Sequence, residues 1–439
     1  MAIKRRSYFK NPMKIIIFGA SGDLSKRKLF PALSSVYSKS TKVIGYARSG
    51  LTHTFSKELR KFYDYKTDFP EQVEYIQGDY SDLKLLENII TPDTVLYFSV
   101  PPKIHNVLLM NLSDYKFYSI EIEKPFGVDL ESFNEITKHL HRNIHFIDHY
   151  LLKSLVVAIP VLYRNDKKLF ELLSKDTVKQ INCHFLESIL SEAREYFDKA
   201  GIIKDVMQNH LIEILAAILS DKTTDERSSK ARAKFIKKIE IPKQDFYFGQ
   251  YDSYQKDLGR ESNCETFAAF MCRCSDPKWT DVPIMMIAGK GLDRKATEII
   301  FDLKVTSLGI FKNKIPNYSI LKNTIVSSKL VFSIAPVNEV FLEIFVQGKS
   351  SKIVLYDSSY IDAIKMKRFG DNEEYQIVFD SLLKKAYFPS VSPEEAHELW
   401  RIFDRINGSK KYLNYYPSGS PIPSEAILYL DSIKDDNNK

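Results

Sequence analysis

Cysteine is scarce in this chain: there are four in 439 residues, at irregular spacings. A secreted fold stabilised by disulfides needs more cysteines at regular spacings. We therefore exclude a fold of that kind and expect the protein in a reducing compartment. The longest apolar runs, such as MKIIIFGA from Met13, fall far short of the roughly 20 residues that a membrane helix needs. The basic segment 1–12 has neither a signal-type apolar region nor a cleavage pattern. We therefore predict a cytoplasmic location and no membrane partner.

Tandem repeats are missing too, and the polar tail DDNNK is the one low-complexity stretch. The net charge is +7, from 63 lysines and arginines against 56 acids. Apart from 4–6 and 26–28, the basic residues are spread along the chain, which favours an anionic small ligand over a nucleic-acid surface. We expect no nucleic-acid partner.

Residues 13–148 alternate short apolar runs with amphipathic stretches of roughly 10–15 residues. The runs lie at 14–19, 42–47, 73–78, 94–100, 117–122 and 143–148. Near-continuous apolar strands separated by helices are typical of a parallel, doubly wound sheet. We predict an α/β, Rossmann-like N-terminal domain at 1–148.

After Asp148 the pattern changes. We expect helices at 150–175, 201–219 and 372–407, and a strand at 178–187. Strands with a two-residue alternation follow at 265–274, 282–289, 297–304, 329–336 and 339–348. Successive strands without helices between them favour antiparallel pairing. We predict an α+β C-terminal domain with a large antiparallel sheet at 149–439.

A glycine turn, GASGDLSKRKLFPAL from Gly19, follows the first apolar run. In a dinucleotide site, such a turn brings backbone N–H groups and the positive end of a helix to the pyrophosphate. Gly19 permits the tight turn and Gly22 a close approach of the backbone. The usual third glycine is absent, and an ordinary strand–helix turn can look the same.

The second run ends in Arg48, and the next acid along the chain is Glu58. A site specific for NAD usually has an acid there for the ribose 2′-hydroxyl. An acid would repel a 2′-phosphate, whereas a guanidinium can grip it. This favours NADP over NAD, although a solvated surface arginine is an alternative interpretation.

Two motifs end the fifth and sixth runs, Glu123-Lys-Pro-Phe-Gly and Ile147-Asp-His-Tyr. Ligands of open α/β sheets bind outside the carboxyl ends of the strands, so both motifs lie where chemistry is expected. Lys124 can hold anionic or hydroxyl groups, and Pro125 restricts the turn and is a candidate for a cis bond. A simple turn would also explain these residues.

A third motif, GIIKDVMQNH, ends at His210. On an α-helical wheel His210 falls on the apolar face, which by itself favours a core histidine. Asp205 lies about 140° away round that wheel, so helical periodicity does not bring the two together. The residues alone leave the role of His210 open.

In this order, GASGDLSKRK, EKPFG, IDHYLLK and GIIKDVMQNH make the chain resemble glucose-6-phosphate dehydrogenases. Weaker likeness at 248–251, 265–270, 279–295, 397–404 and 416–426 extends this over nearly the whole chain. The resemblance implies oxidation of D-glucose 6-phosphate at C1 to 6-phosphoglucono-1,5-lactone with hydride transfer to NADP+, the first step of the oxidative pentose phosphate pathway. It also implies a homodimer or homotetramer joined through the second-domain sheet.

The resemblance also implies residue roles. His210 is the expected general base, and Asp148 is the carboxylate that orients it and raises its basicity. The expected substrate-binding residues are Lys124, His149, Tyr150, Lys153, Glu187, Asp205, Lys290 and Arg294. The expected cofactor-binding residues are Gly19, Ser21, Gly22, Asp23, Leu24, Arg48, Pro101, Lys124 and Pro125.

The residues around IDHY depart from the family pattern: Phe146 stands in place of an arginine, Leu152 of a glycine and Ser154 of a glutamate. Two alternatives therefore stay open, a non-catalytic homologue that binds NADP or a sugar phosphate and a sugar dehydrogenase of the glucose–fructose oxidoreductase and inositol dehydrogenase type. A further cluster, His139, His141, His145 and His149, looks like a metal site. It crosses from a helix end into a strand, and nearby cysteines or carboxylates do not complete it, so we expect no metal.

Overall fold

The computed structural model describes residues 13–139, 143–191, 195–220, 228–242, 246–407 and 412–436. The chain divides into two compact units. The first is made of Met1–His149 and Asn372–His397, and the second of Tyr150–Asp371 and Glu398–Lys439. The predicted domains, 1–148 and 149–439, stay a prediction. The segment Asn372–His397 is notable because it belongs to the first unit although it follows most of the second in sequence.

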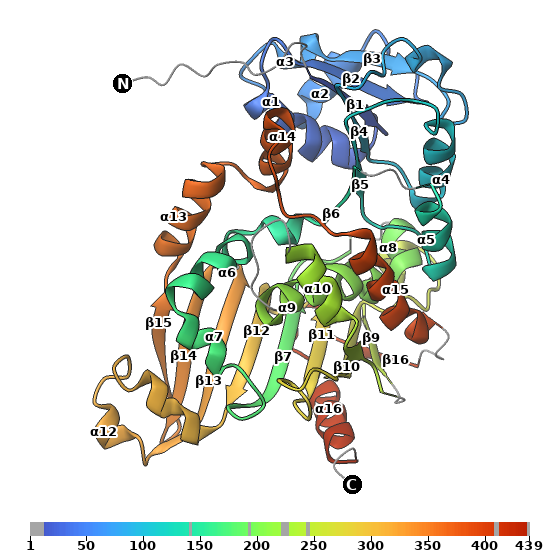
Figure 1. Ribbon diagram of the computed structural model, residues 1–439. Coiled ribbons are helices and arrows are strands. Elements are labelled where there is room, and N and C mark those ends of the chain that lie inside the picture. The colour runs from blue at the N-terminus through green and yellow to red at the C-terminus, as the bar shows by residue number, and fades with distance from the viewer. Residues whose placement is uncertain are drawn as a thin grey trace, which may run out of the picture. The chain divides into compact units, whose positions relative to one another are not determined.

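The first unit contains a six-stranded, all-parallel sheet in the order β3-β2-β1-β4-β5-β6 (Figure 1). Its strands are β1 (Lys14–Phe18), β2 (Lys42–Ala47), β3 (Glu74–Gln77), β4 (Thr94–Phe98), β5 (Ser119–Glu123) and β6 (Ile144–Ile147). β1 and β4 are almost entirely buried because helices cover both faces of the sheet. The predicted Rossmann-like, doubly wound sheet is confirmed.

The helices of this unit are η1 (Ser25–Leu29), α1 (Phe30–Val36), α2 (Phe55–Phe62), α3 (Phe69–Gln72), η2 (Lys84–Leu86), α4 (Pro102–Asn111), α5 (Leu130–Thr137) and α14 (Glu374–Lys384). α14 comes from the returning segment and packs against α1, as Figure 1 shows. It brings Phe379 to within 5.3 Å of the Tyr97 ring on β4, measured between ring centroids. The returning segment thus completes the core of the first unit.

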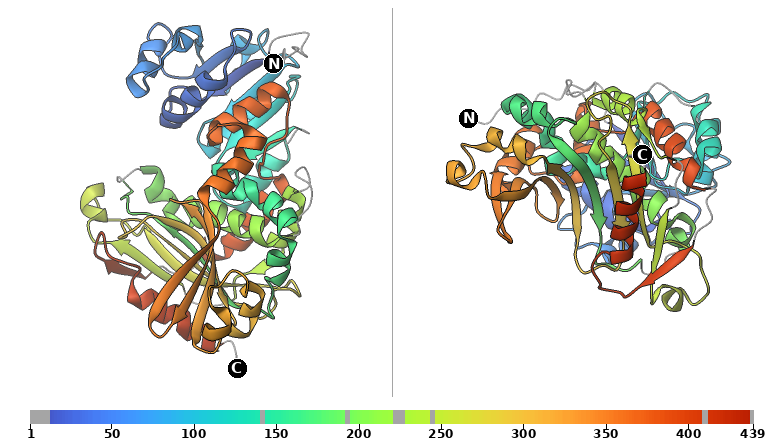
Figure 2. Two further views of the ribbon diagram at one scale, coloured as in Figure 1. Left: turned by 90° about the vertical axis from the view of Figure 1, so that its left-hand side faces the viewer. Right: turned by 90° about the horizontal axis from the view of Figure 1, so that it is seen from below.

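The second unit is built on a large sheet, which Figure 2 shows from two further sides. This sheet has ten strands; its main path is β15-β14-β13-β12-β7-β11-β10-β9-β16, and β8 pairs with β10. The strands are β7 (Val178–Leu186), β8 (Ile239–Glu240), β9 (Tyr247–Tyr251), β10 (Phe267–Cys274), β11 (Ile284–Gly289), β12 (Ala296–Leu303), β13 (Ile325–Ala335), β14 (Glu339–Val346), β15 (Lys349–Tyr356) and β16 (Leu413–Tyr416). The large, mostly antiparallel sheet is confirmed. Two pairs depart from it, because β7–β11 and β9–β16 are parallel.

The helices of the second unit are η3 (His149–Leu152), α6 (Ser154–Asn165), α7 (Lys167–Leu172), α8 (Glu195–Ile202), η4 (Ile203–Leu211), α9 (Ile212–Leu219), α10 (Ser228–Ile236), α11 (Tyr254–Leu258), η6 (Val305–Phe311), α12 (Tyr318–Leu321), α13 (Ser358–Phe369) and α16 (Ser424–Asp436). η3 begins at the last residue of the first unit, and α15 (Pro393–Asn407) runs from the first unit into the second. Among the described helices, none combines the length and the apolarity of a bilayer-spanning segment.

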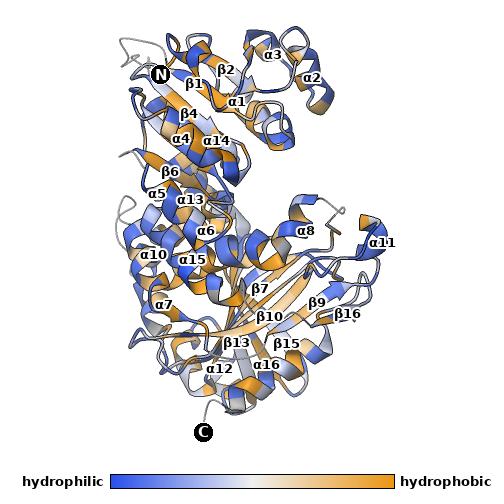
Figure 3. Cartoon of the chain, turned by 90° about the vertical axis from the view of Figure 1, so that its right-hand side faces the viewer, coloured by the Kyte–Doolittle hydropathy of each residue, from blue (hydrophilic) through white to orange (hydrophobic). Residues whose placement is uncertain are grey.

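The core of the second unit lies between its helices and the middle of the sheet. β10 and β11 are buried almost throughout, and Figure 3 shows the apolar colouring of the central strands. α16 accounts for part of this burial because it packs against β10, and Lys434 on α16 donates to Gln180 on β7 (2.8 Å). β15 is mostly exposed because it is an edge strand.

One predicted helix differs from the expectation. The stretch 201–219 is not a single α-helix: Gly201 is non-helical, Ile203–Leu211 is a π-helix and Ile212–Leu219 is α-helical. A π-helix has hydrogen bonds from i to i+5, so its residues turn by less than 100° each. The separation of 140° between Asp205 and His210, derived from an α-helical wheel, is therefore wrong.

Candidate active site

The turn after β1 is tight and is packed against the end of β4. Gly19 has a φ of +83°, and a Cβ there would lie 2.0 Å from the carbonyl oxygen of Ser99, just after β4. The N–H of Gly22 donates to the Gly19 carbonyl (2.9 Å), which closes the turn. Position 19 therefore needs a glycine both for its backbone conformation and for space.

The other predicted cofactor residues of this loop lie around the turn. The hydroxyl of Ser21 is 3.0 Å from that of Ser49, so the loop touches the residues that follow β2. Asp23 is exposed and forms an ion pair with Arg27 (2.7 Å). Leu24 is the residue before η1, and Pro101 is the residue before α4.

Arg48 directly follows β2, and its guanidinium lies over the ring of Tyr80, 5.6 Å from the centroid. Such a cation–π contact restrains the arginine at the carboxyl end of the sheet. The nearby acid Asp79 is engaged by Ser81, whose N–H and hydroxyl both donate to its carboxylate (2.8 and 2.7 Å). These bonds, first of all the one from the backbone, hold the pKa of Asp79 below its usual range.

The carboxyl ends of β5 and β6 carry the next predicted residues. The Lys124–Pro125 peptide bond is cis, as the sequence suggested for Pro125. Asp148 follows β6 and is 1% exposed. The His149 ring stacks on Tyr375 of α14, with centroids 6.1 Å apart and an interplanar angle of 24°.

In the second unit, the predicted base His210 lies on η4 among aromatic rings. Its centroid is 4.4 Å from that of Tyr150 and 6.1 Å from that of Phe185 on β7. The ammonium of Lys153 lies over the ring of Tyr150, 5.5 Å from its centroid. The structure thus brings His210 together with Tyr150 and Lys153, two of the predicted phosphate ligands.

A second cluster joins three more predicted residues. Lys290 follows β11 and forms ion pairs with Glu187, which follows β7, and with Asp205 on η4 (3.6 Å). β7 and β11 are parallel neighbours, so the residues after their carboxyl ends emerge side by side. Burial alone would lower the pKa of Lys290, but the charges of Glu187 and Asp205 outweigh it and raise that pKa.

The structure does not place Arg294 in either of these clusters. Its side chain is 51% exposed, and its ion-pair partner is Glu298 on β12 (3.6 Å). A substrate role for Arg294 stays a prediction.

Comparison with protein-family models gives two matches that together span most of the chain. The model "Glucose-6-phosphate dehydrogenase, NAD binding domain" matches residues 16–157, and "Glucose-6-phosphate dehydrogenase, C-terminal domain" matches residues 161–436. The chain belongs to the glucose-6-phosphate dehydrogenase family. With both family domains present, it is an oxidoreductase with glucose-6-phosphate dehydrogenase activity.

Curated members of the family match over nearly their full length. The glucose-6-phosphate 1-dehydrogenase of Encephalitozoon cuniculi is 39% identical over 433 residues, which cover 96% of this chain and 100% of that protein. The enzyme of the same name from Saccharomyces cerevisiae is 29% identical, over 97% of this chain and 94% of that protein.

Solved structures agree. A glucose-6-phosphate dehydrogenase in complex with its substrate glucose 6-phosphate is 26% identical, with a TM-score of 0.79 and coverage of 97% of this chain and 98% of that one. The 3-ketoreductase KijD10 from Actinomadura kijaniata, in complex with NADP and TDP-benzene, is 12% identical, with a TM-score of 0.54 over 93% of this chain and 100% of that one. This second likeness shows a shared fold only.

Sequence reasoning missed several residues that surround the family motifs. Phe185 flanks His210 and Tyr375 flanks His149, and neither lies in the motifs that carry the resemblance. A signal for two buried carboxyl groups was available, because Glu121 and Glu123 interrupt a strand that otherwise reads as apolar. Buried acids of this kind need partners. The partner of Glu121 is His145, whose Nδ1 lies 3.0 Å from the carboxylate oxygen Oε2.

The pairing with Glu121 involves His145, which is one of the four histidines that looked like a metal site. Burial would lower the pKa of His145, but Glu121 outweighs it and raises the pKa, as expected of an ion pair. His141 lies outside the described residues. The expectation that this cluster holds no metal stays a prediction.

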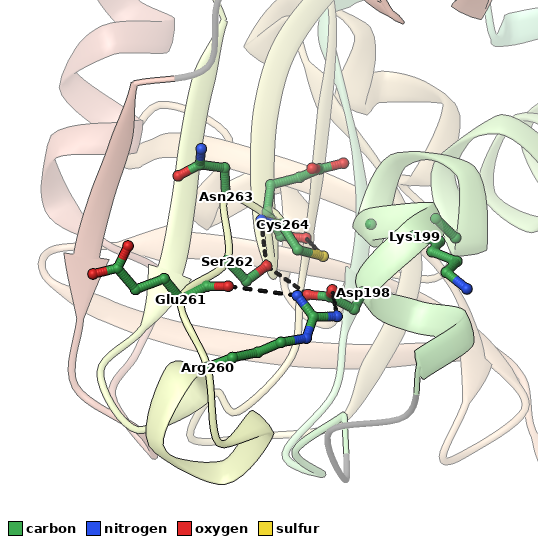
Figure 4. Close-up of a pocket in the computed structure, with 10 residues that line it drawn as sticks. Asp198, Lys199, Arg260, Glu261, Ser262, Asn263 and Cys264 are labelled. Atoms are coloured by element: carbon green, nitrogen blue, oxygen red, sulfur yellow. Dashed lines mark hydrogen bonds and ion pairs between the residues drawn. The ribbon is translucent and has the colours of Figure 1, made fainter.

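A separate hollow of about 430 Å³ lies between residues 198–201 and 260–265 of the second unit (Figure 4). Its wall is held by Asp198, whose carboxylate accepts from Tyr254 (3.0 Å) and Ser262 and pairs with Arg260. The charge of Asp198 is thus engaged within the wall. None of the residues that line this hollow was predicted as a site residue.

Proposed function

We propose that this chain oxidises glucose 6-phosphate at C1 with NADP+ as the hydride acceptor, and that His210 takes the proton of the C1 hydroxyl. A base that gains a proton among aromatic rings needs a carboxylate to stabilise the imidazolium, and Asp148 has that role. The observation that carries the proposal is the arrangement around His210: its imidazole packs on the ring of Tyr150, and the ammonium of Lys153 lies over that same ring.

The nucleotide side of the proposal is supported by the loop after β1. Gly19 allows a tight turn packed against the Ser99 carbonyl, and such a turn between a strand and a helix suits a pyrophosphate held by backbone N–H groups. Arg48 provides a restrained guanidinium where sites specific for NAD have an acid, so we expect a preference for NADP. When bound, the nicotinamide supplies the hydride acceptor, while Lys124 and Pro125 shape the adjacent edge of the sheet.

The sugar phosphate has complementary groups in the second unit. Lys153, with Tyr150 beneath its ammonium and His149 adjacent in the chain, suits the phosphate. Glu187 and Asp205 suit sugar hydroxyls because ionised carboxylates accept hydrogen bonds, and Lys290 offsets their charge. The second unit therefore offers partners both for the charged phosphate and for the hydroxyl groups of the sugar.

The test is the formation of reduced nicotinamide by the purified full-length protein. We expect turnover with glucose 6-phosphate and NADP+, less with NAD+, and little with unphosphorylated glucose. His210→Asn should abolish most turnover, by about 10²–10⁴-fold for a lost general base, while glucose 6-phosphate still binds. Turnover of His210→Asn at the unmodified rate would refute the role of His210, and preference for unphosphorylated glucose would refute the assigned substrate.

We further propose that the protein is cytoplasmic and self-associates through the ten-stranded sheet as a dimer or tetramer. Support comes from apolar side chains near its β13–β15 end, where Val326 is 67% exposed and Val354 is 46% exposed. Val354→Lys should shift the mass measured by light scattering toward the monomer. An unchanged mass would contradict this interface.

A further inference from the structure

A row of polar side chains runs along one face of the buried strand β5. Ser119, Glu121 and Glu123 occupy alternate positions and are at most 5% exposed, at 1%, 0% and 5% respectively. Alternate residues of a strand face the same side of a sheet. Two carboxyl groups are thus buried in the core of the first unit, where an unsatisfied charge would be costly.

The first of these groups has a structural explanation. Glu121 accepts from the Ser119 hydroxyl (2.7 Å) and pairs with His145 on the neighbouring strand β6. It is a satisfied ion pair of the core.

The second group has a different setting. The Glu123 carboxyl accepts from the hydroxyl of Tyr97 on β4 (2.5 Å) and from that of Tyr375 on α14. Two charges also act on it: Lys124, next in the chain, and Asp148, after β6. Its two hydrogen-bond partners, Tyr97 and Tyr375, are neutral phenols. Neither of them supplies a positive charge that would balance an ionised Glu123.

Burial raises the pKa of Glu123 to about 8; Asp148 adds to the rise, while Tyr97, Lys124 and Tyr375 oppose it. Near neutral pH this carboxyl therefore carries its proton for most of the time. A neutral neighbour leaves the ammonium of Lys124 able to attract an anionic or hydroxyl-bearing ligand, whereas an ionised Glu123 would compete for it.

Tyr375 connects this carboxyl to the predicted phosphate ligand His149. Its hydroxyl donates to Glu123 and its ring stacks on the His149 imidazole, so one side chain spans the carboxyl ends of β5 and β6. Tyr375 belongs to the segment that returns to the first unit after the second.

We propose that Glu123, held between the hydroxyls of Tyr97 and Tyr375, is a positioning residue for the dehydrogenase reaction and fixes Lys124 and His149 at the carboxyl edge of the six-stranded sheet. This inference rests on the proposed function, because that function is what makes Lys124 and His149 substrate-binding residues. None of the three cluster residues needs to touch the substrate. They act through the residues beside them.

The experiment compares Glu123→Gln, Tyr375→Phe and Tyr375→Leu with the unmodified full-length protein. Glu123→Gln is isosteric with the neutral acid and cannot ionise. At about pH 9, only about one tenth of a group with a pKa near 8 keeps its proton, so the unmodified protein should keep about one tenth of its neutral-pH activity there, whereas Glu123→Gln should keep nearly all of its own. An alkaline limb that is identical in the two proteins would overturn the inference.

The tyrosine variants separate the two contacts of Tyr375. Tyr375→Phe keeps the ring and loses the bond that lowers the pKa of Glu123, so the alkaline limb should move to higher pH with KM for glucose 6-phosphate unchanged. Tyr375→Leu also loses the stack on His149 and should raise that KM several-fold, more than it lowers kcat. Equal effects of the two variants on KM and on the pH profile would overturn the assignment.

Tyr65→Phe is the matched control, because Tyr65 is a buried tyrosine of the same unit whose hydroxyl has no hydrogen-bond partner. Its pH profile and KM should equal those of the unmodified protein. Calorimetric titration with glucose 6-phosphate provides a readout that does not need turnover. An unmodified protein that binds but does not turn over would refute the proposed function, while weaker binding by Tyr375→Leu alone would still support the cluster.

Discussion

The backbone conformation of Gly201, two residues before the start of the π-helix η4, can be tested by substitution. Gly201 has a φ of +68°, and a Cβ added there would lie 2.1 Å from a carboxylate oxygen of Glu265, which is 1% exposed. With a ψ of 173°, this backbone lies in a region that is essentially restricted to glycine, so it costs an alanine about 1–3 kcal/mol. Moving a buried carboxylate costs roughly 1–3 kcal/mol more, as in other overpacked cores. We expect Gly201→Ala to lower the free energy of unfolding by about 2–6 kcal/mol.

Gly370→Ala is the matched control for this prediction. Gly370 lies in the same unit with a φ of +68° and a ψ of −162°, close to the backbone angles of Gly201, but a Cβ there would meet no atom within 4 Å. It should show only the backbone cost of about 1–3 kcal/mol. The difference between the two variants therefore measures the collision with Glu265.

Urea unfolding followed by tryptophan fluorescence is the suitable assay. The two tryptophans, Trp279 and Trp400, are both buried in the second unit, so the signal reports on the unit that holds both glycines. Adding Glu265→Ala to Gly201→Ala should recover part of the loss, which a double-mutant cycle measures. Equal destabilisation by Gly201→Ala and Gly370→Ala would refute the contact between position 201 and Glu265.

Three more predictions follow from single contacts. Arg48→Ala should weaken NADP+ binding by about 10–150-fold, the equivalent of a charge-assisted hydrogen bond of about 1.5–3 kcal/mol, and leave NAD+ binding nearly unchanged, as titration of both nucleotides would show. Lys290→Met should raise KM for glucose 6-phosphate and lower the thermal midpoint, because two carboxylates lose their shared partner. Since the pKa of Glu123 is raised to about 8, stability should fall as pH rises from about 5 to 8 by up to about 1.4 kcal/mol per unit. Glu123→Gln should remove that slope in pH-dependent urea unfolding.

Much of the first unit could be predicted from the sequence because its strands are buried on both faces. Continuous apolar runs between amphipathic segments leave little choice but a parallel sheet with helices on each side. Gly19 and Arg48 were identifiable because strand ends of such a sheet lie at a known edge. The contribution of α14 was not, because nothing local in 374–384 indicates that the chain returns to pack on α1.

The second unit was less predictable for a related reason. Two-residue alternation reveals strands but not their order or direction, so the parallel pair β7–β11 was missed inside a sheet expected to be antiparallel. The π-helix at Ile203–Leu211 was missed because apolar spacing was compared with an α-helical wheel. In both cases tertiary packing, which the sequence pattern does not encode, decides the local geometry.

The missed parallel pair is what makes the ion cluster of the second unit possible. β11 has six residues and spans about 20 Å at about 3.3 Å each. Had β7 run antiparallel to β11, the residue after β7 would lie beside the start of β11, about 20 Å from Lys290, and Glu187 could not pair with it. With the strands parallel, Glu187 and Lys290 leave the sheet together, and the N–H of Glu187 donates to the Gly289 carbonyl (2.9 Å). A single strand direction thus places a lysine and a carboxylate at one edge, just as the first unit places Lys124 and Asp148 after its parallel strands.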